Sequence, residues 1–174
     1  MKRTAEAAYL RYILAGVIIF AIFILQYSGL VTLSMGKMTA MLVVPAVVYS
    51  AMYMGEIGGT VLGLIMGVFL DCVMWRAVCF NALFLMAVGF VCSLFARHLM
   101  NRNIWSALVL SASATGGYFL CKWLVFTAFT TPGAGAIFWQ YLVPSFFYTV
   151  VISLPLYFLF SAILRQKSGE VKRV

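Results

Sequence analysis

The chain alternates long apolar runs with short polar interruptions, and this alternation predicts its elements. A helix needs about 20 apolar residues, at about 1.5 Å rise each, to cross a hydrocarbon core of about 30 Å. Six runs come near that length, at 12–33, 38–54, 57–75, 78–96, 104–126 and 137–164. The pattern therefore predicts an all-α integral membrane protein, a single bundle of six transmembrane helices.

The second run is the weakest of the six. Its residues, 38–54, span only about 25 Å, and Pro45 lies inside it, so a re-entrant segment is an alternative. The charge distribution argues against that alternative. With six crossings, nine of the twelve basic residues fall on one side of the membrane, namely Lys2, Arg3, Arg11, Arg97, Arg102, Arg165, Lys167, Lys172 and Arg173. By the positive-inside rule, both termini are expected in the cytoplasm.

The composition supports a membrane protein over a globular one. Of the 174 residues, 65% are hydrophobic and 9% are charged, and the mean hydropathy is +1.07. The net charge of +8 comes mostly from the basic side, where it can also contact anionic lipid head groups. A nucleic-acid partner is not indicated, and activity must come from the membrane bundle itself.

The residues that commonly carry catalysis or bind metals are sparse. The four cysteines, Cys72, Cys79, Cys92 and Cys121, show no C-x-x-C spacing, and His98 is the single histidine. Packing between helices is the simplest role for these cysteines, and a pairing of the first two is an alternative. No nucleophile has a base nearby, and no nucleotide motif is present, so the sequence predicts no enzyme, cofactor or metal site.

A stripe of small residues marks the third run. Gly55, Gly59, Gly63 and Gly67 recur every fourth residue, which places them on nearly one face of a helix. Glycine allows the close backbone approach on which helix association in lipid depends. We expect another helix to lie against this stripe, either from the same chain or from a partner.

Strongly polar side chains are predicted to gather in the outer half of the membrane. This set comprises Gln26, Asp71, Arg76, Asn81, Lys122 and Gln140. A carboxylate in hydrocarbon costs at least about 2.5 kcal/mol and normally faces protein or water. Two interpretations stay open: a structural ion pair of Asp71 with Lys122 or Arg76, or an outward seam that receives a partner or ligand.

The same residues resemble a known family. The run that leads to "GLIMGVFLDC", followed by Asn81-Ala82-Leu83, is similar to the central signature of the bacterial rod-shape-determining protein MreD. The first run, which ends in Leu25-Gln26, and the last, with "VPSFFYTVVISLPLYFLF", resemble the ends of that family. The recurrent elements that carry over are Gln26, Pro45, Gly63, Gly67, Asp71, Asn81, Pro144 and Pro155. A glycine expected just before Asn81 is replaced by Cys79 or Phe80, and the segment from Asp71 to Asn81 is bulkier here.

The resemblance implies a non-enzymatic component of the machinery for cell-wall elongation in the bacterial plasma membrane. Such proteins work with MreC, a single-span protein, and regulate a RodA-type glycosyltransferase and its class B penicillin-binding transpeptidase partner. The family is also similar in fold to the substrate-binding subunits of energy-coupling-factor vitamin transporters. A vitamin-binding subunit is therefore the alternative. Such subunits usually carry an Ala-x-x-x-Ala pattern in the first span, which is missing here, since the residue four positions after Ala15 is Ile19 and the one four positions after Ala21 is Leu25.

Overall fold

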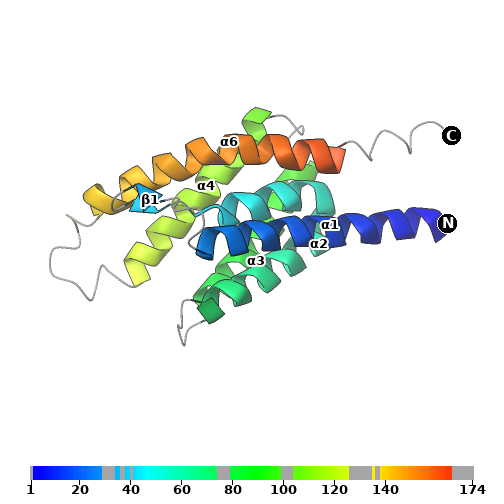
Figure 1. Cartoon of the computed structure of the whole chain (residues 1–174), viewed down its shortest axis with the longest axis horizontal. Coiled ribbons are helices and arrows are strands. Elements are labelled where there is room, and N and C mark those ends of the chain that lie inside the picture. Colours follow the sequence, from blue (N-terminus) through cyan, green and yellow to red (C-terminus); the bar gives the residue numbers. More distant parts are fainter. Residues whose placement is uncertain are drawn as a thin grey trace.

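The computed structural model is a bundle of long helices, and it describes residues 2–28, 34–35, 38–39, 41–73, 79–98, 104–125, 135 and 138–165. The helices are α1 (Lys2–Tyr27), α2 (Val43–Val73), α3 (Phe80–His98), α4 (Ile104–Trp123) and α6 (Val143–Arg165), which a short π-helix, η2 (Phe138–Leu142), precedes. Figure 1 shows that α1 begins and α6 ends at the same end of the bundle.

A short antiparallel ribbon follows α1. Strand β1 (Ser34–Met35) pairs with β2 (Met38–Thr39), with Ser34 opposite Thr39 and Met35 opposite Met38. The pairing is antiparallel, so the chain reverses direction between the first two predicted runs.

The second and third predicted runs form one broken helix. Within α2, Gly55 has φ 81° and ψ 179°, a conformation that interrupts the helix and that residues other than glycine rarely adopt. The first half, Val43 to Met54, reaches only about 18 Å, which is too short to cross the hydrocarbon alone. The expectation of a full second span at 38–54 is thus not met, since the helix begins at Val43 and breaks at Gly55. Pro45 lies in its first turn, where proline is tolerated.

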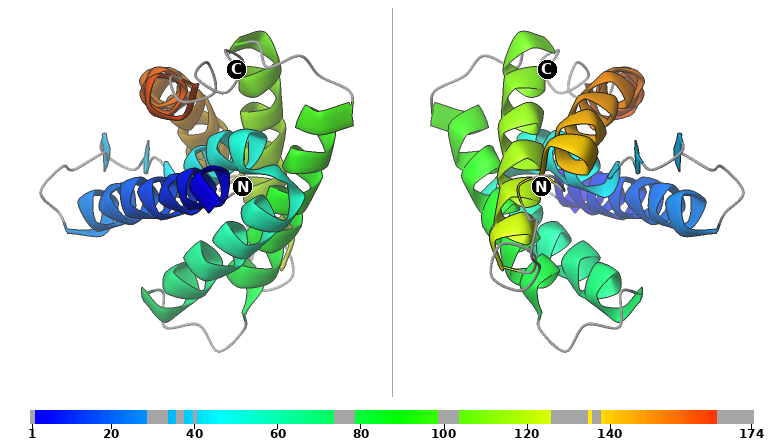
Figure 2. Two further views of the ribbon diagram at one scale, coloured as in Figure 1. Left: turned by 90° about the vertical axis from the view of Figure 1, so that its right-hand side faces the viewer. Right: turned by 90° about the vertical axis from the view of Figure 1, so that its left-hand side faces the viewer.

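The first half of α2 forms the centre of the bundle. Of its twelve residues all but Tyr53 are buried, so protein surrounds it on every side, as an all-round hydrophobic helix requires. Figure 2, seen along the long axis, shows this cyan segment in the middle, with the other helices arranged around it. Tyr49, fully buried, packs edge-on against Tyr157 at a centroid distance of 5.6 Å and donates a hydrogen bond to the Ser111 hydroxyl at 3.1 Å.

Four helices within the described residues are long and apolar enough to cross a membrane: Val43–Val73, Phe80–Arg97, Ile104–Trp123 and Phe138–Ala162. A shorter apolar helix covers Ile13–Tyr27. On α4, Trp105 and Trp123 stand about 27 Å apart along the axis, close to the thickness of a hydrocarbon core. Tryptophans at such a spacing are typical of the two interfacial belts.

Candidate functional site

The start of α3 is held by a side chain from another helix. Asp71, 7% exposed near the end of α2, accepts hydrogen bonds from the backbone N–H groups of Asn81 (3.2 Å) and Ala82 (2.9 Å). It also accepts one from the Asn81 side-chain amide at 2.8 Å. The first N–H groups of a helix have no partner within it, and in lipid an unpaired group costs several kcal/mol. Asp71 therefore acts as a helix cap supplied across the interface, with its partial negative charge at the favourable end of the helix dipole.

This network continues into α4. The Asn81 side-chain oxygen accepts a hydrogen bond from the Tyr118 hydroxyl at 2.9 Å, and both residues are buried. The Lys122 ammonium lies 5.5 Å from the centroid of the Tyr118 ring, within range of a cation–π interaction. Tyr118 is about 7 Å below Trp123 along α4, so the network lies beneath the interface at that end of the bundle. Three helices are joined through it.

A second network of the same kind holds the start of α2. The Gln26 side-chain oxygen, on α1, accepts a hydrogen bond from the Leu42 N–H at 3.0 Å. The Thr149 hydroxyl, on α6, accepts one from the Met41 N–H at 3.2 Å. Pro45 has no N–H to satisfy, which makes it well suited to this turn. Two helix starts inside the bundle are thus capped by side chains from neighbouring helices.

The structure therefore separates the predicted polar seam into parts. Asp71, Asn81 and Lys122 come together around the start of α3, and Gln26 serves the start of α2. Gln140 is exposed on η2 and joins neither network, and Arg76 lies outside the described residues. The ion pair expected for Asp71 is not found with Lys122: across the described ranges the ion pair is between Arg97 and Glu56, at 3.0 Å. Asp71 is bound by amide groups instead, because those of α3 need an acceptor.

The glycine stripe brings α2 and α3 together. A Cβ atom at Gly59 would overlap the side chain of Ser93, one at Gly63 the Leu85 carbonyl, and one at Gly67 the backbone of Ala82. Of the two partners that the sequence left open, the helix against these glycines belongs to the same chain. Gly55 was expected in the stripe but lies at the break, with nothing within 4 Å of its Cβ position.

Three side chains that the sequence analysis did not single out belong to these contacts. Thr149 caps α2, Tyr118 extends the Asp71 network, and Ser93 donates a hydrogen bond to the Ala51 carbonyl at 3.1 Å. Each is a hydroxyl within a mostly apolar run, which is the signal that would have revealed it. Such hydroxyls are common within membrane helices, where they also hydrogen-bond to carbonyl groups of their own helix. The sequence therefore does not show which of them cap another helix.

The cysteines and the potential metal ligands are the remaining candidates for chemistry. All four cysteines are free, including Cys72 and Cys79, for which pairing was an alternative. Over the described residues, no group of three or more histidine, cysteine, aspartate or glutamate side chains could hold a metal ion.

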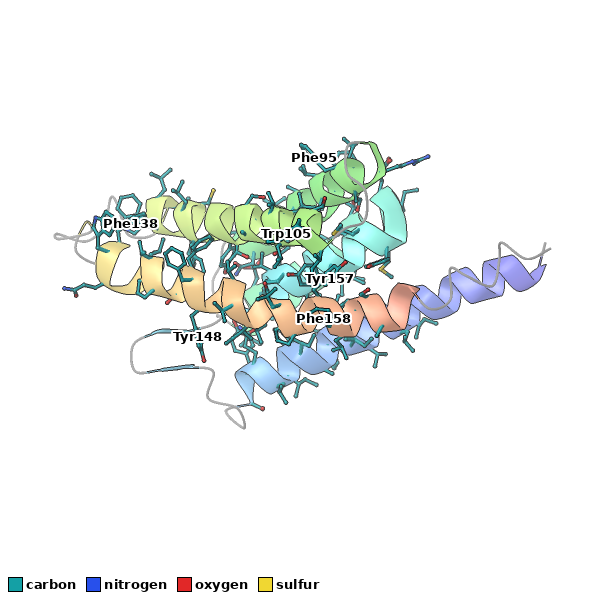
Figure 3. All side chains as sticks on the ribbon, turned by 90° about the horizontal axis from the view of Figure 1, so that it is seen from above. Phe95, Trp105, Phe138, Tyr148, Tyr157 and Phe158 are labelled. Carbon is teal, nitrogen blue, oxygen red and sulfur yellow. The ribbon has the colours of Figure 1, made fainter. Side chains whose placement is uncertain are left out.

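Two grooves flank α4, and apolar side chains line most of each. One lies between α3 and α4, where Phe84, Val91, Phe95, Val109 and Gly117 are among its walls, and its volume is about 450 Å³. The other, also about 450 Å³, lies between α4 and the η2–α6 segment. Figure 3 shows Phe138 at one end of the bundle and Phe95 and Trp105 toward the other. These grooves offer apolar surface rather than polar binding groups.

The fold and its capped helix starts define the class of this chain: a multi-pass helical membrane protein with polar contacts that join its own helices. No protein-family model, curated protein or solved structure matches it.

Proposed function

We propose that this chain is a non-enzymatic membrane scaffold of the machinery that elongates the bacterial cell wall. In this role it controls rod shape together with an MreC-like single-span partner in the plasma membrane. Through that partner it regulates a RodA-type glycosyltransferase and a class B penicillin-binding transpeptidase.

One observation carries the proposal: the residues behind the MreD resemblance converge in space. Gly63, Gly67 and Asp71 all contact the segment of α3 that begins at Asn81. Two further elements of the resemblance lie at the start of α2, where Gln26 accepts a hydrogen bond at 3.0 Å and Pro45 occupies the first turn, while Pro144 and Pro155 lie on α6 outside both junctions. Residues scattered over some fifty positions thus form two junctions of one design, which supports a shared architecture over a chance match of hydrophobic motifs.

The exposed surface supports a scaffold as well. Of the polar groups considered for a ligand, Gln26, Asp71 and Asn81 are engaged at helix starts, and the described grooves are mainly apolar. What this surface can present to another protein is apolar helix face, suited to close packing in lipid. The vitamin-binding alternative has no comparable supporting observation.

Site-directed photo-crosslinking in the native host tests the proposal. Val17 on α1, Val109 on α4 and Val151 on α6 are matched positions, exposed to 61%, 60% and 62%. A photoreactive phenylalanine at each should give a crosslink to an MreC-like chain from one helix, while the other two positions serve as controls. Gentle purification of the tagged chain should recover the same partner. Recovery of transporter ATPase subunits, or stabilisation by a vitamin, would overturn the proposal.

A further inference from the structure

The second half of α2, residues 56–73, and α3 form one stiff unit, which we call the hairpin. At Gly63 and Gly67 the two backbones are too close to admit a Cβ atom. Both ends of the hairpin are fastened: Asp71 caps the start of α3, and at the opposite end the Arg97 guanidinium donates a hydrogen bond to the Glu56 carboxylate at 3.0 Å. Because close-packed elements do not deform gradually, a motion of the hairpin has to carry both helices together.

Gly55 joins the hairpin to the buried first half of α2. That half is held in place at its start, where the Met41 and Leu42 N–H groups bind side chains of α6 and α1. Gly55 has φ 81°, and nothing lies within 4 Å of its Cβ position. Glycine can exchange this conformation for many others without steric cost. A residue of this kind, between a fixed segment and a stiff one, is where a hinge motion is absorbed.

On the side of α4, a groove separates the hairpin from the rest of the bundle. Its walls are mostly apolar side chains of α3, from Phe84 to Phe95, and of α4, from Val109 to Gly117. Near the hinge, the hairpin is joined to the first half of α2 by the hydrogen bond from Ser93 to the Ala51 carbonyl. A contact so close to the hinge moves little when the hairpin turns. The groove therefore marks the gap across which the hairpin can approach or leave α4.

The end of the hairpin far from Gly55 is held by a directional contact. The Tyr118 hydroxyl on α4 donates a hydrogen bond to the Asn81 side-chain oxygen at 2.9 Å. On the other side, the Phe69 ring lies 5.5 Å and 6.1 Å from the rings of Phe20 and Phe23 on α1, and such apolar contacts can slide. The sixteen residues from Gly55 to Asp71 span about 24 Å, so a turn of about 10° at the hinge shifts this end by about 4 Å.

We propose that the hairpin swings as a rigid arm about Gly55 and that the hydrogen bond between Tyr118 and Asn81 latches it against α4. Opening widens the groove and uncovers the Tyr118 hydroxyl and the Asn81 side chain, both of which are buried in the closed arrangement. This inference does not depend on the proposed cell-wall role, because it concerns the chain alone.

Double electron–electron resonance of the full-length chain in lipid nanodiscs tests the inference. Spin labels attached to p-acetylphenylalanine leave the native cysteines in place. One labelled pair, Leu83 on α3 and Leu120 on α4, crosses from the hairpin to the rest of the bundle at the far end, with exposures of 63% and 53%. Two control pairs lie within one body each: Val61 with Leu83 inside the hairpin, and Leu120 with Val151 outside it. The first pair should show a second, longer distance, whereas each control pair should show a single narrow one.

Tyr118→Phe tests the latch, because it keeps the ring and removes the hydroxyl. The population of the longer distance between positions 83 and 120 should rise about threefold, the factor that corresponds to one interhelical hydrogen bond of average strength. Tyr49→Phe is the matched control. It also removes a buried hydroxyl that bonds to another helix, at Ser111, but this bond lies outside the hairpin, so the distances should stay as in the wild type.

Gly55→Ala tests the hinge, because alanine disfavours a φ of 81°. The main distance between positions 83 and 120 should shift, while the distance between 61 and 83 stays the same. Thermal unfolding verifies that each variant folds. A single narrow distance for the 83–120 pair in both the wild type and Tyr118→Phe would overturn the inference. An equal rise of the longer distance in Tyr49→Phe would also overturn it, since loosening would then be general rather than confined to the hairpin.

Discussion

The cap that Asp71 provides to α3 can be tested by removing it. Asp71→Leu deletes the acceptor of three hydrogen bonds, two from backbone N–H groups and one from the Asn81 amide. Interhelical hydrogen bonds in membrane proteins contribute about 0.6 kcal/mol on average and at most about 1.7. Three bonds together predict a loss of about 2 to 5 kcal/mol in the free energy of unfolding. Asp71→Asn keeps one acceptor oxygen and should lose about half as much.

Steric trapping in bicelles measures this free energy without removing the protein from lipid. The matched control is Gln140→Leu, an exposed polar residue at the same end of the bundle, for which a change within about 0.5 kcal/mol is expected. Hydrogen exchange gives a local readout, because the Asn81 and Ala82 amides should exchange faster in Asp71→Leu than in the control. Unchanged stability of Asp71→Leu together with unchanged exchange at these two amides would refute the capping argument.

Three other predictions follow from the backbone. Gly63→Ala should destabilise the bundle by about 1 to 3 kcal/mol, because the added Cβ would overlap the Leu85 carbonyl. Gly16→Ala is the control, since nothing lies within 4 Å of that Cβ position, and it should be neutral or stabilising. Equal melting temperatures of the two variants would contradict the close contact of α2 and α3 at the glycine stripe. Gly55→Ala should cost about 1 to 3 kcal/mol through its φ of 81° alone, as measured by the same unfolding assay, and a neutral result would mean that the break tolerates a side chain. Pro45→Ala should change stability by less than about 1 kcal/mol, since the residue sits in the first turn of α2, and a larger loss would show that the ring matters beyond its missing N–H.

The boundaries of most helices followed from hydropathy. The predicted runs 78–96 and 104–126 correspond to α3 and α4 within a few residues, because an apolar stretch of that length has few other stable states in lipid. The first run differs more, since α1 covers Lys2–Tyr27 where 12–33 was predicted, and the second run forms only the first half of a broken helix. Its apolar character indicated a crossing, but a segment buried on all sides by protein is as apolar as one that faces lipid.

The candidate site was predicted in composition but not in arrangement. Depth along each run was enough to place Asp71 and Asn81 at one level. Their bond, however, depends on how α2 and α3 rotate about their axes, and the close approach at Gly63 and Gly67 decides that rotation. An ion pair with Lys122 or Arg76 was one of the two interpretations left open for Asp71, and it neglected the unpaired N–H groups at the start of α3.

The sequence by itself determined the medium, the approximate helices and the end of the bundle where polar groups gather, because these properties depend on local hydropathy and on counting crossings. Only the tertiary structure decided which groups satisfy one another. The N–H groups at helix starts within the bundle cannot hydrogen-bond to lipid, so they bind side-chain oxygens of a neighbouring helix. Which helix lies close enough depends on packing between segments that are distant in the chain.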